Sequence, residues 1–450
     1  MTSEKCSYRQ SRTAAMCLTI VTVLLVAAGS AQESVILKLA GASDGGNPEG
    51  ALIADSAGNL YGMGSEGGSA TFGAVFELSP PASGGAWTET TLYSFTGKPD
   101  GWYPTGPLVM DKFGNLYGTT LYGGSANAGT VFELSPPAVA GGPWTETVLH
   151  SFIGLPSDGS IPLGGLVIDA AGNVYGTTDY GGGCGWGTAF ELSPPATSGG
   201  AWTEQVIYSF RYTCNNRTTN DGGHPNTGLA INGSGVLYGT TWVGGQPYMG
   251  TVFKLTPPSA GHTAWSEQVI YTFTGASDGS FPVYGVTLYK GNLYGVSAYG
   301  SNLACNFGIP GCGVVFELSP PTTSGGAWTF ASLYSFTGGA DGADPGSSVI
   351  FDRQGNLYTS SMEGANALAG TQCATNGCGA VIKLAPPVSG GSWTETTLYS
   401  FSGRADGGSN PSGPVIGLFN RLYGTTFAGG DKSCGYYGAI GCGVVYKIIP

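Results

Sequence analysis

Residues 107–152 read PLVMDKFGNLYGTTLYGGSANAGTVFELSPPAVAGGPWTETVLHSF and carry the pattern that decides the fold. Four runs in this stretch, at 108–110, 116–120, 130–134 and 144–150, are rich in β-branched, aromatic and other apolar residues. Glycine, proline, aspartate or asparagine separates each run from the next, and these residues supply the turn conformations that hairpins need. The stretch therefore predicts four short antiparallel strands.

Three motifs from this stretch, and a fourth that lies on either side of it, recur in the same order along the chain. Asp-Gly-x-x-Pro begins at Asp44, Asp100, Asp158, Asp221, Asp278 and Asp341, with one inserted residue after Asp406. A Leu-Tyr core has its tyrosine at 61, 117, 175, 238, 294, 358 and 423. Gly-x-Val-Phe-Glu-Leu-Ser-Pro-Pro has its aromatic residue or isoleucine at 76, 132, 190, 253, 316, 382 and 446. Trp-Thr-Glu-x-x-x-Tyr-Ser-Phe begins at Trp87, Trp144, Trp202, Trp265, Trp328 and Trp393.

Four antiparallel strands per repeat are typical of a β-propeller blade. A β-solenoid is the alternative, but its coils are usually shorter. The fourth motif has a partial copy near the start of the chain, where Glu33 matches Glu89 and Leu39 matches Phe95. We expect residues 32–40 to be the fourth strand of the last blade, which would close the ring and cover both open sheet edges. The predicted fold is all-β, a single seven-bladed propeller over residues 32–450.

Composition agrees with this fold. With 80 Gly, 27 Pro and 10% charged residues, the chain is poorly suited to helices. Its 41% hydrophobic and 12% aromatic content argues against disorder. The formal charge is −12, and because the first 31 residues hold three cations and one anion, the remainder carries −14. Nucleic acid and anionic membrane surfaces are therefore excluded as expected partners.

The N-terminus reads as a targeting segment. Lys5, Arg9 and Arg12 precede an apolar run at 14–28 and small residues at 29–31. This order predicts a signal peptide over residues 1–31, and a retained membrane anchor is the alternative. We expect a secreted monomer, extracellular or periplasmic. Cleavage would leave eight of the ten cysteines, an even number that indicates disulfides.

The recurring Pro-x-Gly-x-Leu, Asp-x-x-Gly-Asn-Leu-Tyr-Gly-Thr-Thr and Gly-Thr-Val-Phe-Glu-Leu string resembles the GloVer-type tandem repeat of secreted bacterial proteins, over residues 33–450. Leu-Val-Ile-Asp-x-x-Gly-Asn-Leu-Tyr is similar to the first hairpin of NHL-type propeller blades. The resemblance implies an exported, repeat-built protein and brings no catalytic residues. Relatives of the choice-of-anchor class often carry an anchoring module. Since nothing follows Pro450, we expect release.

The NHL-like strand order would place the Leu-Val-Ile strand innermost and the Trp strand outermost. The loops between strands two and three would then share a face with the Asp-Gly loops that lead to the next blade. Three cysteine pairs each lie within one such loop, and one pair joins two loops of blade three. The predicted disulfides are Cys184–Cys214, Cys305–Cys312, Cys373–Cys378 and Cys434–Cys442. Zinc is the alternative, but no Cys-x-x-Cys or neighbouring histidine accompanies them.

Two sets of residues on this face are candidates for binding. The seven Asp-Gly aspartates would either bind Ca²⁺ or cap backbone N–H groups in the turns. The second set consists of aromatic residues in variable positions, which would either stack on sugars and anchor partners or merely cover the blades. Its members are Trp102, Tyr103, Tyr122, Tyr180, Trp186, Trp242, Tyr248, Phe281, Tyr299, Tyr436 and Tyr437. Arg211 and Arg217, in the long loop that leaves blade three, could bind an anionic group.

Evidence for catalysis in the sequence is thin. His150, His224 and His262 fall in different blades or on different faces, so no triad and no His-metal cluster is predicted. The leading interpretation is a non-enzymatic protein that binds an extracellular polysaccharide or protein through its loop-rich face. The alternative is a carbohydrate-active or other hydrolytic enzyme with a site at the central channel. No cofactor is expected apart from possible Ca²⁺.

Overall fold

The structure is a computed structural model. It describes residues 32–41, 44–82, 84–139, 141–197, 199–214, 217–218, 221–305, 309–323, 325–365, 373, 377–388, 390–403, 408–430, 434–436 and 439–450. The predicted signal peptide lies outside them. Within these ranges no helix is long and apolar enough to cross a membrane, and the helical structure is the 3-10 turn η1 (Leu418–Asn420). The remaining regular structure is β.

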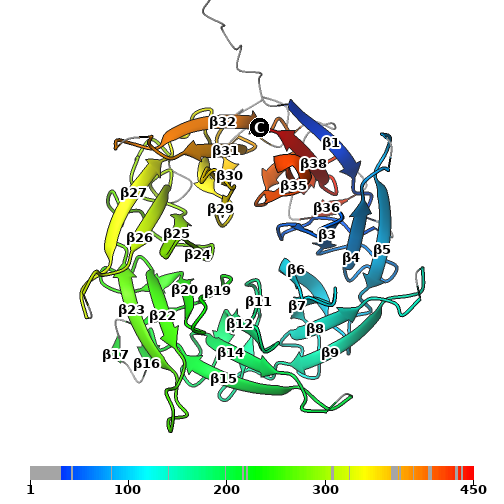
Figure 1. Cartoon of the computed structure of the whole chain (residues 1–450), viewed down its shortest axis with the longest axis horizontal. Helices are drawn as coiled ribbons and strands as arrows, with labels where there is room; N and C mark the ends of the chain where they lie inside the picture. The colour runs from blue at the N-terminus through cyan, green and yellow to red at the C-terminus, as the bar shows by residue number, and fades with distance from the viewer. Residues whose placement is uncertain are drawn as a thin grey trace, which may run out of the picture. The chain divides into compact units, whose positions relative to one another are not determined.

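Seven antiparallel sheets surround a common centre, which confirms the seven-bladed propeller (Figure 1). Blade one is β2 (Ile53–Ala54), β3 (Leu60–Gly64), β4 (Ala74–Ser79) and β5 (Thr88–Ser94); blade two is β6 (Trp102–Met110), β7 (Leu116–Tyr122), β8 (Thr130–Ser135) and β9 (Thr145–Ser151). Blade three is β11 (Val167–Ile168), β12 (Val174–Thr178), β14 (Thr188–Ser193) and β15 (Thr203–Ser209); blade four is β19 (Ala230–Ile231), β20 (Leu237–Thr241), β22 (Thr251–Thr256) and β23 (Ser266–Thr272).

Blades five to seven follow the same order. Blade five is β24 (Thr287–Tyr289), β25 (Asn292–Ser297), β26 (Val314–Ser319) and β27 (Thr329–Ser335); blade six is β29 (Ile350–Phe351), β30 (Leu357–Glu363), β31 (Ala380–Ala385) and β32 (Thr394–Ser400). Blade seven is β34 (Val415–Ile416), β35 (Leu422–Gly429), β38 (Val444–Ile449) and β1 (Gln32–Lys38). In each blade the strand with the Trp motif, or β1, lies outermost, as predicted (Figure 1).

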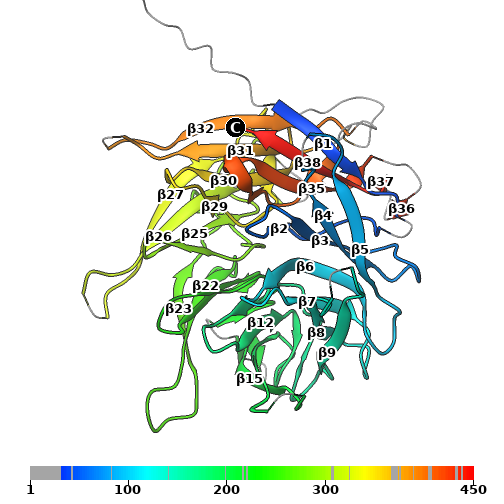
Figure 2. The ribbon, with the colours of Figure 1, turned by 45° about the vertical axis from the view of Figure 1, so that its right-hand side comes forward.

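The ring closes through the N-terminal strand. β1 pairs antiparallel with β38, from Gln32 opposite Ile449 to Lys38 opposite Val444, and Figure 2 shows the two strands side by side. Leu39 is buried, and its N–H donates to the Gly443 carbonyl at 3.1 Å. Phe95, the matching residue of blade one, makes the same bond to Gly73 at 3.0 Å. The predicted closure is confirmed to the residue.

The glycine after the Leu-Tyr pair is a packing requirement. Gly118 pairs with Phe132 of the next strand, and a Cβ at this glycine would lie 2.6 Å from the Phe132 ring. Blade six carries Thr359 at this position, and its partner there is Ile382 instead of phenylalanine. The smaller isoleucine leaves room for a side chain. The two motifs are therefore coupled across each blade.

The core lies between neighbouring blades. In five of the blade interfaces, the phenylalanine that ends the Trp strand packs edge-on against the third-strand aromatic residue of the next blade, as Phe95 does on Phe132 at 5.1 Å. The same contact recurs in the pairs Phe152–Phe190, Phe210–Phe253, Phe273–Phe316 and Phe401–Tyr446. These rings are almost fully buried. Each burial is worth roughly 1.5–3 kcal/mol, so the interfaces between blades hold the ring together.

One face, here called the turn face, carries the Asp-x-x-Gly and Ser-Pro-Pro turns. In blade two, Asp111 Oδ1 accepts the N–H groups of Phe113 and Asn115 at 2.8 and 2.9 Å, and its Oδ2 accepts the Asn115 amide at 2.9 Å. Asp55, Asp169 and Asp352 make the same set of bonds. The turn face is thus structurally repetitive.

The opposite side, here called the loop face, carries the loops between strands two and three and the Asp-Gly loops. Short strands extend it: β10 (Gly159–Ser160) with β13 (Tyr180–Gly181), β16 (Thr213–Cys214) with β17 (Arg217–Thr218), β18 (Gly222–Gly223) with β21 (Val243–Gly244), β28 (Ala343–Pro345), β33 (Gly408–Pro411), and β36 (Gly435–Tyr436) with β37 (Ala439–Ile440). All four predicted disulfides are present. Since Cys184–Cys214 joins the two kinds of loop, it confirms that they share this face.

Candidate functional site

Several Asp-Gly aspartates of the loop face accept hydrogen bonds from residues of the outermost strands. Asp100 is buried and accepts hydrogen bonds from the Tyr93 hydroxyl at 2.7 Å and from the Thr96 N–H and hydroxyl at 3.0 Å. Asp278 and Asp341 make the same contacts. These bonds support the turn interpretation. Calcium binding by the aspartates remains a prediction from the sequence.

The other aspartates vary this arrangement. Asp44 accepts the Ala40 N–H at 2.8 Å, and Asp158 contacts His150. Asp221 accepts the Tyr208 hydroxyl and the N–H of Arg211. Asp406 lies outside the described residues. The six described carboxylates belong to six different blade junctions, and the structure does not gather them into one site.

A ring of left-handed residues lies on the loop face. It consists of the seven residues before the proline of Asp-Gly-x-x-Pro. They are Asn47, Tyr103, Ile161, His224, Phe281, Asp344 and Asn410, with φ between 51° and 61°. Left-handed backbone costs a non-glycine residue roughly 1–2 kcal/mol. Each N–H in this left-handed ring donates to a carbonyl of the preceding blade at 2.7–3.2 Å, so inter-blade bonding holds the conformation.

Six of the predicted aromatic residues meet in one patch over blades three to five. Tyr212 and His224 join them, and we call the eight residues the aromatic patch. Its ring-to-ring contacts are Tyr180–His224, Trp186–His224 and Trp186–Tyr212 at 4.9 Å, Tyr212–Tyr248 and Trp242–Phe281 at 5.8 Å, His224–Trp242 at 6.0 Å, and Phe281–Tyr299 at 6.3 Å. Tyr180, Trp242 and Tyr248 are 45%, 38% and 37% exposed. The aromatic patch therefore offers rings to solvent.

Polar contacts fix the centre of the aromatic patch. His224 Nδ1 lies 3.1 Å from both the carboxylate and the backbone carbonyl oxygen of Asp179. The Trp186 indole N–H donates to the Thr213 carbonyl at 2.8 Å, beside the Cys184–Cys214 disulfide. The rings are therefore held in place by backbone and disulfide.

Carboxylates and tyrosines form a second group at the edge of the aromatic patch. The Tyr103 hydroxyl donates to Glu49 at 2.8 Å. Burial and the charge of Glu363 raise the pKa of Asp344 to about 7. Burial and the charges of Asp344 and Glu49 raise the pKa of Tyr284. Glu49 precedes blade one and Asp344 precedes blade six, and the charges of both act on Tyr284 of blade five. We call Glu49, Tyr103, Tyr284, Asp344 and Glu363 the acidic group.

Three predicted residues lie apart from the aromatic patch. Trp102 stacks on Tyr122 at 4.5 Å, with Phe72 edge-on at 6.3 Å, in a separate cluster of blades one and two. The Arg211 side chain is 58% exposed, and its Nε lies 3.6 Å from Asp221. That contact places Arg211 at a blade junction. The side chains of Arg217 and Tyr436, and all of Tyr437, lie outside the described residues.

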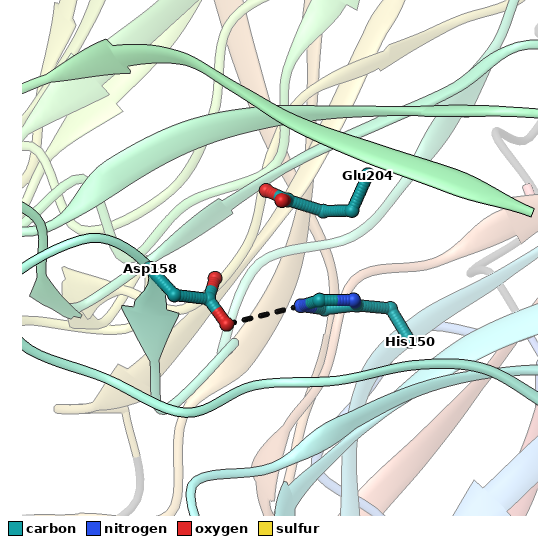
Figure 3. Close-up of side chains that lie close together, drawn as sticks. All are labelled: His150, Asp158 and Glu204. Atoms are coloured by element: carbon teal, nitrogen blue, oxygen red, sulfur yellow. Dashed lines mark hydrogen bonds and ion pairs between the residues drawn. The ribbon is translucent and has the colours of Figure 1, made fainter.

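Sequence reasoning missed three features of the site. It did not single out the left-handed ring, although a variable residue between fixed glycine and fixed proline marks it in every repeat. It did not find Glu49 and Asp344 as neighbours of Tyr284, because no motif spans those blades. The sequence also indicated no group that combines a histidine with other potential metal ligands, whereas the structure contains one. His150 of β9 lies beside Asp158 and Glu204 of β15, across the junction of blades two and three (Figure 3).

Comparison with protein families agrees with the repeat architecture. A family model described as the Gloeobacter/Verrucomicrobia repeat matches residues 21–219 and 203–435. The chain belongs to this repeat family. Membership in the Gloeobacter/Verrucomicrobia repeat family confirms the relationship that the motifs indicated. No curated protein matches the chain.

Solved structures similar to this member of the Gloeobacter/Verrucomicrobia repeat family are distant. A putative 6-phosphogluconolactonase from Bacteroides uniformis is 13% identical, with a TM-score of 0.49 over 89% of this chain and 99% of that one. A putative oxidoreductase (glucose dehydrogenase) from Thermus thermophilus is 15% identical, with a TM-score of 0.42 over 78% and 98%. A gluconolactonase from Xanthomonas campestris is 11% identical, with a TM-score of 0.38 over 93% and 89%. At these values the similarities carry no functional argument.

Proposed function

We propose that this protein is secreted and binds an uncharged polysaccharide through its loop face without catalysing a reaction. The observation that carries the proposal is the aromatic patch, in which Tyr180, Trp242 and Tyr248 present partly exposed rings from two neighbouring blades. Rigid aromatic rings stack on the apolar faces of sugars at little entropy cost. A set of such rings spread over two blades suits a chain of sugar units better than a single small molecule.

The acidic group supports the choice of an uncharged chain. Glu49 and Asp344 offer oxygens that accept hydrogen bonds from sugar hydroxyls, and the Tyr103 and Tyr284 hydroxyls can donate or accept. The chain carries a formal charge of −12, so an anionic polysaccharide would be repelled. Hydroxyl-rich, neutral polymers fit both the aromatic patch and the acidic group.

Secretion is part of the proposal. Four disulfides in a chain of this size are typical of an oxidising compartment. The cationic start and apolar run of residues 1–31 provide the targeting signal. An extracellular or periplasmic protein would meet polysaccharides directly, and we expect it to act as a monomer.

The experiment is affinity electrophoresis of the purified protein through gels that contain single neutral polysaccharides. We expect retardation by at least one of them, and at least 10-fold weaker retention for Trp242→Ala and Tyr180→Ala. Phe113→Ala is the matched control, because Phe113 is a 73% exposed aromatic residue on the turn face. Migration of the wild type unchanged in every gel would reject the proposal. Retention lost equally in the Phe113 control would also reject it.

A second candidate is a hydrolase with its site at the centre of the ring. The observation in its favour is Asp344, whose pKa, raised to about 7 by burial and Glu363, would suit a general acid near Tyr284. Incubation with the same polysaccharides, followed by a reducing-end assay, distinguishes the two functions. Release of sugars by the wild type and not by Asp344→Asn would favour the enzyme.

A further inference from the structure

Three of the described blade junctions share a three-residue arrangement. A tyrosine of the outermost strand donates to the Asp-Gly aspartate, and a glutamate from the outermost strand of the next blade lies beside them. Tyr93, Asp100 and Glu146 form this arrangement between blades one and two. Tyr208, Asp221 and Glu267 form it between blades three and four. These junctions serve as internal references for the one between them.

The junction of blades two and three differs by one residue. His150 stands where the neighbouring junctions have tyrosine, and its Nε2 lies 3.1 Å from Asp158 Oδ2. One donor atom each from His150, Asp158 and Glu204 lies within 4.8 Å of the other two. Figure 3 shows the Glu204 carboxylate directed toward the His150–Asp158 pair. Within the described part of the chain, this is the one group of His, Cys, Asp and Glu side chains so arranged.

The Glu204 carboxylate is not fully hydrogen-bonded. Its Oε1 is buried and lacks a hydrogen-bond partner, as do the same atoms of Glu146 and Glu267. Burial raises the pKa of all three carboxyls to about 7, because the charged form is poorly solvated there. Beside Glu146 and Glu267 stand tyrosine hydroxyls, which are poor metal ligands. Beside Glu204 stands an imidazole nitrogen.

We infer that His150, Asp158 and Glu204 together bind one divalent transition-metal ion, best fitted by Zn²⁺, which joins the outermost strands of blades two and three. Imidazole with two carboxylates is a donor set that Zn²⁺ accepts, whereas Ca²⁺ and Mg²⁺ prefer oxygen ligands alone. Zinc ligands at 2.0–2.2 Å and tetrahedral angles lie about 3.4 Å apart. The His150–Asp158 spacing is already close to this value, and the Glu204 carboxylate must approach by at most about 1.4 Å.

Neighbouring groups orient the ligands. Asp158 Oδ1 accepts the Gly159 N–H at 2.6 Å and its Oδ2 accepts the Ile153 N–H at 2.8 Å, so the carboxylate cannot turn away. The His150 ring packs edge-on against Phe152 at 4.8 Å. Such fixed outer contacts raise metal affinity. The His150 side chain is 20% exposed, which leaves a path for the ion from solvent.

The test is a zinc titration of the purified, disulfide-bonded protein at pH 7.5, by isothermal calorimetry and by metal content after dialysis. We expect one Zn²⁺ per wild-type chain and at least 10-fold weaker binding by His150→Tyr. That variant reproduces the neighbouring junctions, so it should fold with an unchanged circular dichroism spectrum. Equal zinc binding by the wild type and His150→Tyr would overturn the inference.

A gain-of-site variant tests the donor set independently. Tyr93→His would create the same three ligands with Asp100 and Glu146, and we expect it to bind a second ion. The cobalt-loaded wild type should show visible ligand-field absorption, which His150→Tyr should lose. Absence of both the second ion and the cobalt absorption would contradict the assignment of the ligands.

Discussion

On the turn face, Asp55, Asp111, Asp169 and Asp352 make the same turn with the same hydrogen bonds. On the loop face, the seven equivalent residues of the left-handed ring are two asparagines and one each of tyrosine, isoleucine, histidine, phenylalanine and aspartate. The backbone is hydrogen-bonded on both faces, and on the loop face each residue of the left-handed ring donates to the neighbouring blade. The repeats thus fix the backbone of both faces and vary the side chains of one.

We expect the turn face to contribute mainly to the stability of the fold and the loop face mainly to ligand binding. A side chain that recurs in blade after blade satisfies backbone groups and has no freedom to recognise a ligand. The left-handed ring is constrained in backbone alone, so its side chains can differ, and His224 and Phe281 belong to the aromatic patch. Substitutions on the two faces should therefore have separable effects.

The largest expected effect is a loss of stability on the turn face. Asp169→Ala removes the acceptor for the N–H groups of Ala171 and Asn173 and for the Asn173 amide. We expect a loss of about 2–3 kcal/mol in unfolding free energy, measured by denaturant titration, with polysaccharide retention unchanged. Asp169→Asn is the control and should lose less, because Asn232 accepts the equivalent N–H groups in blade four.

In the second prediction, polysaccharide retention should weaken while the unfolding free energy changes little, which is the reverse of the first. Trp242→Ala on the loop face should weaken polysaccharide retention at least 10-fold, which corresponds to about 1.4 kcal/mol, with little change in unfolding. The Trp242 ring is 38% exposed, so its removal leaves a small cavity. The contradicting result would be a large fall in unfolding free energy, with polysaccharide retention reduced only in proportion to the folded fraction. The two faces would then not have separate roles in stability and binding.

The third effect is a pH dependence of opposite sign on the two faces. Burial raises the pKa of Glu146, Glu204 and Glu267 to about 7, next to the Asp-Gly loops. Folding therefore takes up protons between about pH 4.5 and 7, and this stability is present at low pH and lost as the pH rises through 7. On the turn face, burial would raise the pKa of Asp352, but the hydrogen bonds from Asn356, Tyr358 and Gln354 together outweigh it and lower that pKa, so the contribution of Asp352 is lost only in strong acid.

Thermal unfolding in a chelating buffer checks this. We expect the Tm at pH 8 to lie roughly 2–3 °C below that at pH 5. Replacing the three glutamates together by glutamine should flatten the profile between these pH values. A wild-type Tm that rises from pH 5 to pH 8 would contradict the pKa assignments.

The smallest expected effect concerns the left-handed ring. Ile161 has φ 59°, a conformation that a β-branched residue adopts at a cost. Ile161→Gly should raise the unfolding free energy by about 0.5–1 kcal/mol, less whatever side-chain packing it removes. Ile161→Val, which keeps the branched Cβ, should show no gain. A gain with valine equal to that with glycine would dismiss backbone strain at this position.

Sequence reasoning predicted the elements that repetition makes visible. Seven copies of three motifs and six copies of the Trp motif placed the strands, and the partial match of Leu39 to Phe95 predicted how the ring closes. The cysteine pairs followed from loop position, and Cys184–Cys214 required only the strand order. Each of these predictions rests on contacts that recur in every blade or that join nearby loops.

The candidate site was harder to predict, because it depends on singular contacts. The charges of Glu49 and Asp344 act on Tyr284, although Glu49 precedes blade one and Tyr284 belongs to blade five, and no repeat motif links these positions. His150 stands at the tyrosine position of the Trp motif, but its partner Glu204 stands at an ordinary repeat position. The repeats in the sequence show which residues every blade needs for its fold. The candidate site is built from residues at which single blades differ from the repeat.

Hydroxyl-radical footprinting with a retained neutral polysaccharide tests the central claim most directly. It reports the solvent accessibility of single aromatic side chains on both faces in one experiment. We predict that Tyr180, Trp242 and Tyr248 are protected when the polysaccharide binds, while Phe113 and Phe419, exposed at turns of the opposite face, are oxidised at unchanged rates. Protection of Phe113 and Phe419 without protection of the aromatic patch would contradict the account.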